Sequence, residues 1–350
     1  MSTHRQPDSS PIFIIGTERS GTNLLRLMLN AHSAIAVPHP PHIMKFFAPL
    51  VPLYGDLTRD RNFRTLIGDV CTMVELHPYP WEISPDRERV FREARGRDLI
   101  SVYFAIYDQY LAWSGKRRWC CKSTFMIDHV GEILSHHPSA RFIFMVRDGR
   151  DVAVSARESI FNHFHVYYSA LRWQREQRLG LEWRARLPGE QIMLLKYEEL
   201  LAAPEETVRR LCTFLGEEFE PQMLEYHRSR EAQKSGSLSI SWENTSRPVM
   251  RENREKFRTR LTRSEIFLFE AIAMGELRQL GYELTEPEAE LVSRREELLR
   301  PRLSYRIAEL LMSLRAEARH LLKDRNSLLR VKKILYMKYL RALRRVVPHS

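Results

Sequence analysis

Three short runs of apolar residues lack the alternation of apolar and polar positions that marks a half-exposed strand. They are IFII at residues 12–15, RFIFMV at Arg141–Val146 and QIMLLKY at residues 191–197. Continuous apolar runs of this length are typical of strands that are covered on both faces. We therefore expect these three segments to be strands of a parallel sheet inside the protein.

Other segments carry apolar residues at the three- and four-residue spacing of an amphipathic helix. They cover residues 22–30, 128–136 and 204–215. A further helix is predicted to begin at Thr262, which stands three residues before Glu265 in the arrangement of a capping box. Because strands alternate with helices, we expect an α/β fold of three layers, in which helices flank a central parallel sheet.

The C-terminal part of the chain carries most of its positive charge. Residues 285–350 contain 16 Lys and Arg against 8 Asp and Glu, a net charge of +8 out of +11 for the whole chain. A charge concentrated in one terminal segment is not a nucleic-acid footprint over the whole protein, and we expect no nucleic-acid partner. We expect residues 286–350 to form a basic helical extension.

Within this extension, residues 325–345 contain eight basic residues and no acidic one. Placed at about 100° per residue, their apolar and basic side chains separate onto two faces, as in a basic amphipathic helix. The apolar face holds Val331, Leu335, Tyr339, Leu340, Leu343 and Val347, and the basic face holds Arg330, Lys333, Lys338, Arg341, Arg344 and Arg345. Three roles stay open for this helix: packing on the rest of the chain, contact in a homo-oligomer, and peripheral contact with an anionic membrane surface.

Composition and the N-terminal segment limit which classes of protein this chain can belong to. The chain has 350 residues, of which 43% are hydrophobic, and no apolar run is long enough to predict a membrane-spanning helix. Residues 1–10 are polar and predict a disordered N-terminus without a secretory signal. The four cysteines form no C-x-x-C pair, which favours reduced thiols and a cytoplasmic location.

The loop GTERSGTN follows the first predicted strand. Gly16 and Gly21 keep the glycine spacing of a P-loop, but Thr22 stands where the P-loop has its lysine. Backbone N–H groups in such a turn, at the head of a helix, bind anions. Arg19 adds a permanent cation, and Ser20 and Thr22 add hydroxyl donors. The loop therefore predicts a P-loop-like phosphate site without the usual magnesium clamp.

A second candidate phosphate site lies in FMVRDGRDVAVS. Arg147 stands at the carboxyl end of a predicted strand, where α/β folds bind their ligands, and Ser155 follows on the next helix. Together they could hold one phosphate. An alternative also stays open: the four charges of Arg147, Asp148, Arg150 and Asp151 could simply neutralise one another.

Four segments together resemble the sulfotransferase family, most closely its tyrosylprotein-like and bacterial branch. ERSGTNLLRLMLNAH is similar to the family's 5′-phosphosulfate loop, and FIFMVRDGRDVAVS to its 3′-phosphate-binding segment. LLKYEELLAAPEETVRRLCTFLG and WENTSRPVMRENREKFRTRLTRSEI resemble later segments of the family. The resemblance covers about residues 11–285, which we expect to form a sulfotransferase domain.

The resemblance implies 3′-phosphoadenosine 5′-phosphosulfate (PAPS) as the cofactor, its desulfated product PAP, and no metal. It implies that the 5′-phosphosulfate is held by Arg19, Ser20, Gly21, Thr22 and Asn23, and the 3′-phosphate by Arg147 and Ser155. Tyr197 matches a position near the adenine, and Arg251 matches a phosphate-contacting position of relatives.

The implied reaction is in-line attack of an acceptor hydroxyl on sulfur, which needs charge stabilisation and a base. Arg19 and Lys122 are the candidates for the first task. Relatives take the base from a glutamate after the first helix or from a histidine after the lysine, and this sequence departs from both patterns. His39 and His42 are the candidates here, and we favour His42.

The acceptor stays open among carbohydrate, glycolipid, peptide tyrosine and other small hydroxyl compounds. Two other functions are alternatives: a kinase or nucleoside triphosphatase with a degenerate P-loop, and a non-catalytic membrane-associated binding protein. The missing P-loop lysine counts against the first.

Overall fold

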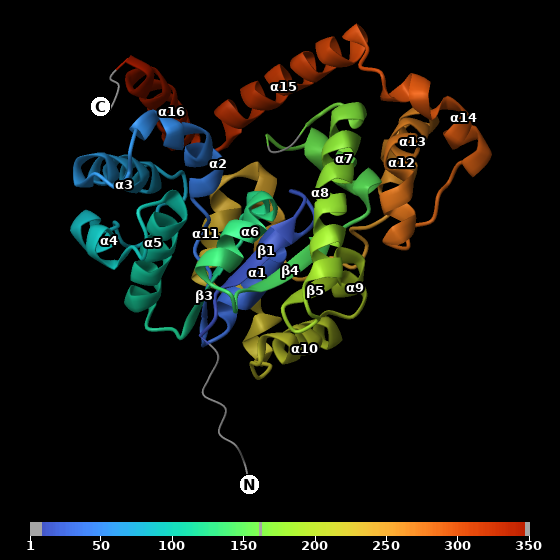
Figure 1. The fold of residues 1–350 in the computed structure, drawn as a ribbon. Coiled ribbons are helices and arrows are strands. Elements are labelled where there is room, and N and C mark those ends of the chain that lie inside the picture. The colour runs from blue at the N-terminus through green and yellow to red at the C-terminus, as the bar shows by residue number, and fades with distance from the viewer. Residues whose placement is uncertain (1–8, 161–162, 347–350) are drawn as a thin grey trace.

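The fold is built on a five-stranded sheet, seen in a computed structural model that describes residues 9–160 and 163–346 (Figure 1). The strand order is β2-β3-β1-β4-β5, and every neighbouring pair is parallel. The strands are β1 (Ile12–Gly16), β2 (Ile35–Ala36), β3 (Arg118–Cys121), β4 (Arg141–Val146) and β5 (Ile192–Lys196). The predicted α/β fold with a central parallel sheet is confirmed, and the three apolar runs are β1, β4 and β5.

Burial on both faces explains why these strands are apolar without alternation. Phe13 and Ile15 of β1 belong to the hydrophobic core on one face, while Ile12 and Ile14 belong to the core on the other. All four side chains are fully buried. Helices therefore cover both faces of the sheet, as in other parallel sheets.

Helices make up most of the remaining described chain (Figure 1). The α-helices up to β5 are α1 (Thr22–Ala31), α2 (Ile43–Phe47), α3 (Asp60–Glu75), α4 (Arg87–Glu93), α5 (Leu99–Ser114), α6 (Val130–His136), α7 (Gly149–Arg157) and α8 (Val166–Arg186). Those after β5 are α9 (Tyr197–Ala202), α10 (Pro204–Leu215), α11 (Arg230–Leu238), α12 (Phe257–Arg260), α13 (Arg263–Gln279), α14 (Glu288–Leu299), α15 (Leu303–Lys323) and α16 (Ser327–Val346). The 3₁₀ helices are η1 (Ala48–Tyr54), η2 (Thr124–His129), η3 (Pro221–Met223), η4 (Tyr226–Arg228) and η5 (Ile240–Ser246).

The predicted helix ends agree with the structure. Helix α10 spans Pro204–Leu215 and ends at Gly216, which adopts a left-handed conformation with φ of 72°. At the start of α13, the Thr262 side chain accepts from the backbone N–H of Glu265, and the Glu265 carboxylate accepts from the backbone N–H of Thr262. This is the predicted capping box.

The connections after β1 and β4 leave the sheet on opposite sides. Helix α1, which follows β1, packs into the core that contains Ile12, whereas Trp173 of α8 packs into the core that contains Phe13. Because β1 and β4 are neighbours, a crevice opens between their carboxyl ends. Open α/β sheets bind ligands at such a topological switch point.

The C-terminal extension crosses above the carboxyl ends of the strands. Figure 1 shows α15 running along the top of the molecule from α14 to α16, and α16 packs against α3 and η1. Its Arg344 pairs with Asp69 of α3. No helix within residues 9–160 and 163–346 is long and apolar enough to cross a membrane.

The basic amphipathic helix is present as α16, but burial does not follow its two faces. Lys333 of the basic face is buried with 6% of its surface accessible, while Leu335 and Tyr339 of the apolar face are exposed. The difference comes from tertiary packing, because α16 lies with the side that carries Lys333 against the rest of the protein. Val347 and residues 1–8 lie outside the described residues, and Ser10 is buried against Ser139.

Candidate active site

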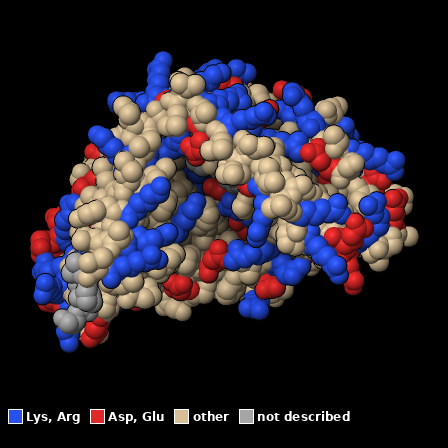
Figure 2. Space-filling model, turned by 90° about the horizontal axis from the view of Figure 1, so that it is seen from above, with Lys and Arg blue, Asp and Glu red and all other residues tan. Residues whose placement is uncertain are grey.

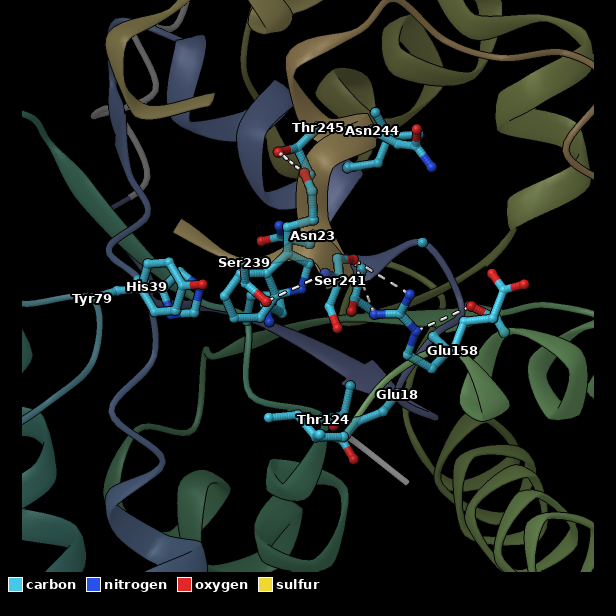
Figure 3. A pocket seen from close by; sticks show the side chains of 18 of the residues that line it. Glu18, Asn23, His39, Tyr79, Thr124, Glu158, Ser239, Ser241, Asn244 and Thr245 are labelled. Carbon is cyan, nitrogen blue, oxygen red and sulfur yellow. Dashed lines mark hydrogen bonds between the residues drawn. The ribbon is translucent and has the colours of Figure 1, made fainter. Parts of the chain in front are cut away.

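A cavity of about 470 Å³ opens where the switch point predicts a ligand site. Its walls come from the β1–α1 loop, α2, α7, η5 and the α15–α16 region. Figure 2 shows a hollow on this face, with Lys and Arg side chains gathered around it. In Figure 3, His39 and Tyr79 lie on one side of the pocket and Glu158 lies on the opposite side. Segments far apart in sequence therefore meet at one site.

The β1–α1 loop wraps tightly at the head of α1. Arg19 and Gly21 both have a left-handed backbone, with φ of 74° and 83°. A Cβ at Gly21 would overlap the ring of Tyr197, so only glycine fits this position. The turn is closed by a hydrogen bond from the Ser20 N–H to the Thr17 carbonyl. Tight turns of this kind aim successive N–H groups into one concavity.

Arg19 connects this loop to two other segments. Its Nε donates to Ser155 Oγ on α7 at 3.1 Å, and its terminal nitrogens donate to the Ser241 carbonyl of η5. Burial and the neighbouring Arg147 lower the pKa of Arg19 to about 10. Arg19 is therefore a cation at neutral pH, held beside a second cation with which it could share an anionic ligand.

Arg147 follows β4 and meets the β1–α1 loop directly. It donates to the Arg19 carbonyl at 3.1 Å and to the Asn253 carbonyl at 3.2 Å. Its guanidinium lies 4.6 Å from the centre of the Tyr197 ring, and the Tyr197 hydroxyl accepts from the Asn253 amide. The structure thus brings Arg19, Arg147, Ser155 and Tyr197 together.

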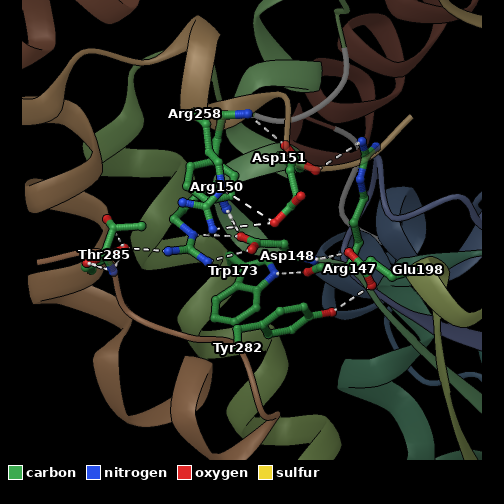
Figure 4. A network of polar contacts seen from close by, with 12 residues as sticks. Arg147, Asp148, Arg150, Asp151, Trp173, Glu198, Arg258, Tyr282 and Thr285 are labelled. Carbon is green, nitrogen blue, oxygen red and sulfur yellow. Dashed lines mark hydrogen bonds and ion pairs between the residues drawn. The ribbon is translucent and has the colours of Figure 1, made fainter. Parts of the chain in front are cut away.

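A polar network behind Arg147 fixes the turn that carries it (Figure 4). Trp173 Nε1 donates to the Arg147 carbonyl, and the Asp148 N–H donates to Glu198. Arg150 pairs with Asp148 and Glu270, so this part of the charge run is neutralised locally, as the alternative interpretation expected. Arg147 forms a longer ion pair with Asp151, at 3.8 Å and without a hydrogen bond between them, so its charge is only partly neutralised.

Several buried polar atoms around the two loops lack partners among the described residues. They include three donors, Ser20 Oγ, Asn23 Nδ2 and Arg147 Nε, and one acceptor, Asp151 Oδ2. A hydroxyl, an amide N–H and a guanidinium N–H are all donors to anionic oxygens. Buried donors normally have partners, so this set fits an anionic ligand of several phosphate oxygens. PAPS has that chemistry.

Lys122 follows β3 and lines the same cavity. Its ammonium has no hydrogen bond or ion pair to the residues that the structure describes. Burial, together with Arg26, lowers the pKa of Lys122 to about 8. Next to it, Ser123 Oγ lies 2.9 Å from Nδ1 of His42.

The two candidate histidines differ in their surroundings. His42 begins α2 with a left-handed backbone, φ 60°, and burial with Lys122, Lys45 and Lys333 nearby holds its pKa well below the usual value. His39 is stacked on Tyr79 at 4.2 Å, and neither ring nitrogen has a partner among the described residues. Burial also lowers the pKa of His39. Both rings are therefore neutral at pH 7.

Arg251 is the predicted site residue that lies apart from the others. It is exposed and does not line the cavity, whereas its neighbours Asn253 and Lys256 do. Sequence analysis also missed lining residues from other segments: Glu18, Lys45, His77, Tyr79, Glu158, Ser241, Trp242, Arg330 and Lys333. Glu18 could have been found from its place in the loop; most of the others depend on tertiary contacts.

A sequence profile of the sulfotransferase family matches residues 11–221. The chain belongs to this family. The match contains Arg19, Lys122, Arg147 and Ser155, and it ends before Asn253 and the C-terminal extension.

Curated relatives of this chain are distant. A protein of Aquifex aeolicus (strain VF5) without an assigned function is 29% identical over 294 residues, which cover 81% of the chain and 34% of that protein. Protein-tyrosine sulfotransferase 1 of Danio rerio is 26% identical over 243 residues, 67% of the chain and 60% of that protein. The matched segments thus cover from about a third to three fifths of the length of these two relatives.

Solved sulfotransferase domains share the fold. The domain from the curacin biosynthetic pathway aligns with a TM-score of 0.54 at 20% identity, over 80% of this chain and all of that chain. The domain of the Synechococcus PCC 7002 olefin synthase aligns with a TM-score of 0.51 at 17% identity, over 80% and 97%.

Proposed function

We propose that this chain transfers a sulfuryl group from PAPS to the hydroxyl of an acceptor. The observation that carries the proposal is the meeting of two loops: Arg19 donates to Ser155, and Arg147 donates to the Arg19 carbonyl. One cavity thus holds the donors that two phosphate groups need. Bound PAPS would supply the sulfuryl group and leave as PAP.

Each group of residues has a separate task in this proposal. Residues 19–23 bind the 5′-phosphosulfate through backbone N–H groups, the Arg19 cation and the hydroxyls of Ser20 and Thr22. Arg147 and Ser155 bind the 3′-phosphate, and Tyr197 lies where the adenine would stack. Arg19 and Lys122 stabilise the charge that grows on the oxygen of the leaving group.

His42 is the proposed base, and its contact with Ser123 Oγ leaves Nε2 as the ring nitrogen that can act. When Nδ1 carries the proton and donates to Ser123 Oγ, Nε2 is left to take the acceptor proton. Nε2 has no partner among the described residues. Ser123 is therefore a positioning residue: its contact fixes the orientation of the ring, and its hydroxyl accepts from Nδ1 in the tautomer that the reaction needs.

The proposal is tested by ligand binding and by transfer. PAP at 100 times its Kd should stabilise the protein by about 2.7 kcal/mol, measured as a thermal shift. Labelled sulfate should move from PAPS to a hydroxyl acceptor in the presence of EDTA, and ATP should not act as a donor. No thermal shift at millimolar PAP would contradict the proposal, and transfer that EDTA abolishes would contradict the metal-free mechanism.

The Lys122 amine predicts an alkaline limb in the pH profile. With a pKa of about 8, Lys122 keeps its charge below pH 8 and loses it above. Since the His42 pKa lies well below 6.5, kcat/KM for PAPS should be level from about pH 6.5 to 7.5 and should fall above about 8. In Lys122→Arg the limb should move toward pH 10, where Arg19 loses its charge. An unchanged limb in this variant would assign it to another group.

Peripheral membrane contact stays a prediction for the extension. Helix α15 exposes Leu303, Ile307, Leu310, Leu311, Leu314, Leu321 and Leu322, and α16 exposes Leu335 and Tyr339 beside basic residues. Apolar side chains with flanking Lys and Arg suit an anionic lipid surface. Co-sedimentation with anionic liposomes tests this contact, and a concentration-dependent dimer without liposome binding would assign the surface to a second copy.

A further inference from the structure

A group of cations lines the cavity outside the two loops that would hold PAPS. Lys45 comes from α2, and Arg330 and Lys333 come from α16, one turn apart. The family profile ends at residue 221, so Arg330 and Lys333 lie in a part of the chain that it does not match. They are a property of this chain's C-terminal extension.

Lys333 is buried and pairs with no carboxylate in the part of the chain that the structure describes. Only 6% of its surface is exposed, and its Nζ donates to the Pro41 carbonyl at 2.9 Å. The same nitrogen lies 4.6 Å from the centre of the Phe46 ring. Burial, with Lys45 nearby, lowers the pKa of Lys333. A carbonyl and a ring face compensate a buried ammonium only in part.

Lys45 and Arg330, which line the same side of the cavity, also have cationic groups that are not fully paired. Lys45 Nζ lies 3.8 Å from the centre of the Phe125 ring and 5.7 Å from that of Phe46, and no described carboxylate pairs with it. Arg330 pairs through Nη1 with Glu317, while its buried Nε and Nη2 have no partner among the described residues. Lys45 and Lys333, both near the Phe46 ring, and the partly paired guanidinium of Arg330 form a cationic group.

The carboxylates of this region are already engaged. Glu18 pairs with Arg172 at 3.0 Å, Glu317 pairs with Arg330, and Asp324 pairs with His320 at 2.7 Å. None of them forms an ion pair with Lys45 or Lys333 within residues 9–160 and 163–346, although Glu18 is close enough to Lys45 to oppose the lowering of its pKa by burial. An unpaired buried charge is unfavourable for stability, which makes such residues candidates for binding a ligand of opposite charge.

The turn between α15 and α16 is fixed to the cavity wall. Asp324 accepts from Ser239 Oγ and from the Ile240 N–H, each at 3.0 Å. Ile240 begins η5, the segment whose Ser241 carbonyl accepts from Arg19. The start of α16 is thus tied to the donor side of the cavity, and the Lys333 contact with Pro41 ties α16 to the residue before His42.

We propose that Lys45, Arg330 and Lys333 bind an oxyanion of the acceptor, a phosphate or carboxylate on the molecule that carries the attacking hydroxyl. The proposal rests on the proposed function and narrows its acceptor to anionic hydroxyl compounds. The anion would lie beside His42, so the same contacts would present the hydroxyl to the base.

Inorganic phosphate is the probe for this subsite. The full chain is first saturated with PAP, which fills the other phosphate positions, and is then titrated with phosphate by calorimetry. We expect binding to the wild type, and Lys333→Met should weaken it by about tenfold or more, as expected when one charge-assisted hydrogen bond is lost. Lys338→Met is the matched control, because Lys338 is exposed on the same helix and should leave phosphate binding unchanged.

A stability measurement separates a ligand-binding lysine from a structural one. If Lys333 serves a ligand, Lys333→Met should be at least as stable as the wild type, because an uncompensated buried amine is removed. Lower stability with unchanged phosphate affinity would overturn the proposal, as would phosphate binding that is absent in the wild type or equally weakened in Lys338→Met. If the chain binds PAP but not phosphate, the proposed function stands and the oxyanion subsite is excluded. If it binds phosphate through Lys333 but does not bind PAP, the oxyanion subsite stands and the proposed function is excluded.

Discussion

Replacing Arg147 with alanine should weaken PAP binding by about 100-fold. Arg147 is 4% exposed, and its Nε has no partner among the described residues at the meeting point of the two loops. Two charge-assisted hydrogen bonds to a phosphate, at roughly 1.5 kcal/mol or more each, account for a loss of this size. Calorimetric titration with PAP measures it. Because Arg147 also donates to the Arg19 and Asn253 carbonyls, some loss of thermal stability should accompany the weaker binding.

Two further variants test whether the loss of PAP affinity is specific to the Arg147 guanidinium. Arg147→Lys keeps a charge but loses the planar fork, so its PAP affinity should lie between those of the wild type and the alanine variant. Arg251→Ala removes an exposed arginine that does not line the cavity, and its affinity should equal that of the wild type. If Arg251→Ala lost affinity while Arg147→Ala kept it, the 3′-phosphate would have to be assigned to a different surface.

Replacing His42 with alanine should lower kcat by roughly 10²- to 10⁴-fold, the usual contribution of a general base. His42 faces the cavity beside Lys122 and Ser123 and is not part of the two phosphate loops. The Kd for PAP should therefore change by no more than about twofold, since charge-neutral imidazole adds little to anion binding. Single-turnover kinetics with PAPS and calorimetry with PAP give the two values.

His39→Asn is the matched test of the other candidate. His39 lies stacked against Tyr79 in the same cavity, and its replacement should leave kcat within a few-fold of the wild-type value. The opposite pattern, a large loss for His39→Asn and none for His42→Ala, would transfer the base role to His39. A loss confined to Glu18→Gln would exclude both histidines, because Glu18 is the carboxylate of the loop that faces the cavity.

The central strands were predictable because their signal is local. Four residues such as those at 12–15, apolar without alternation, can satisfy both faces of a covered sheet, and the structure buries all four. Strand β2 has only two residues, and β3 (Arg118–Cys121) begins with a charged residue, so neither carries a continuous apolar run of four. Their place in the sheet depends on pairing with each other and with β1.

The meeting of the two loops proposed to bind PAPS was predictable for the same reason. A glycine-bracketed loop between a strand and a helix keeps Arg19 and its neighbours within one short segment, and Arg147 and Ser155 lie within another. The match to Arg251 was weaker, because one residue in a loop without regular structure can face either way. The structure turns Asn253 and Lys256, rather than Arg251, toward the cavity.

The other half of the cavity depends on packing between distant segments. His77, Trp242 and Lys333 carry no shared motif, and they meet because α15 and α16 close over the carboxyl edge of the sheet. By itself the sequence determined the parallel sheet, the family resemblance and the two loops that meet at the cavity, since buried strands and glycine-bracketed turns are encoded in short contiguous patterns. Only the tertiary structure decided that Lys333 of the basic helix faces inward, because burial of a helix face depends on what the rest of the chain places against it.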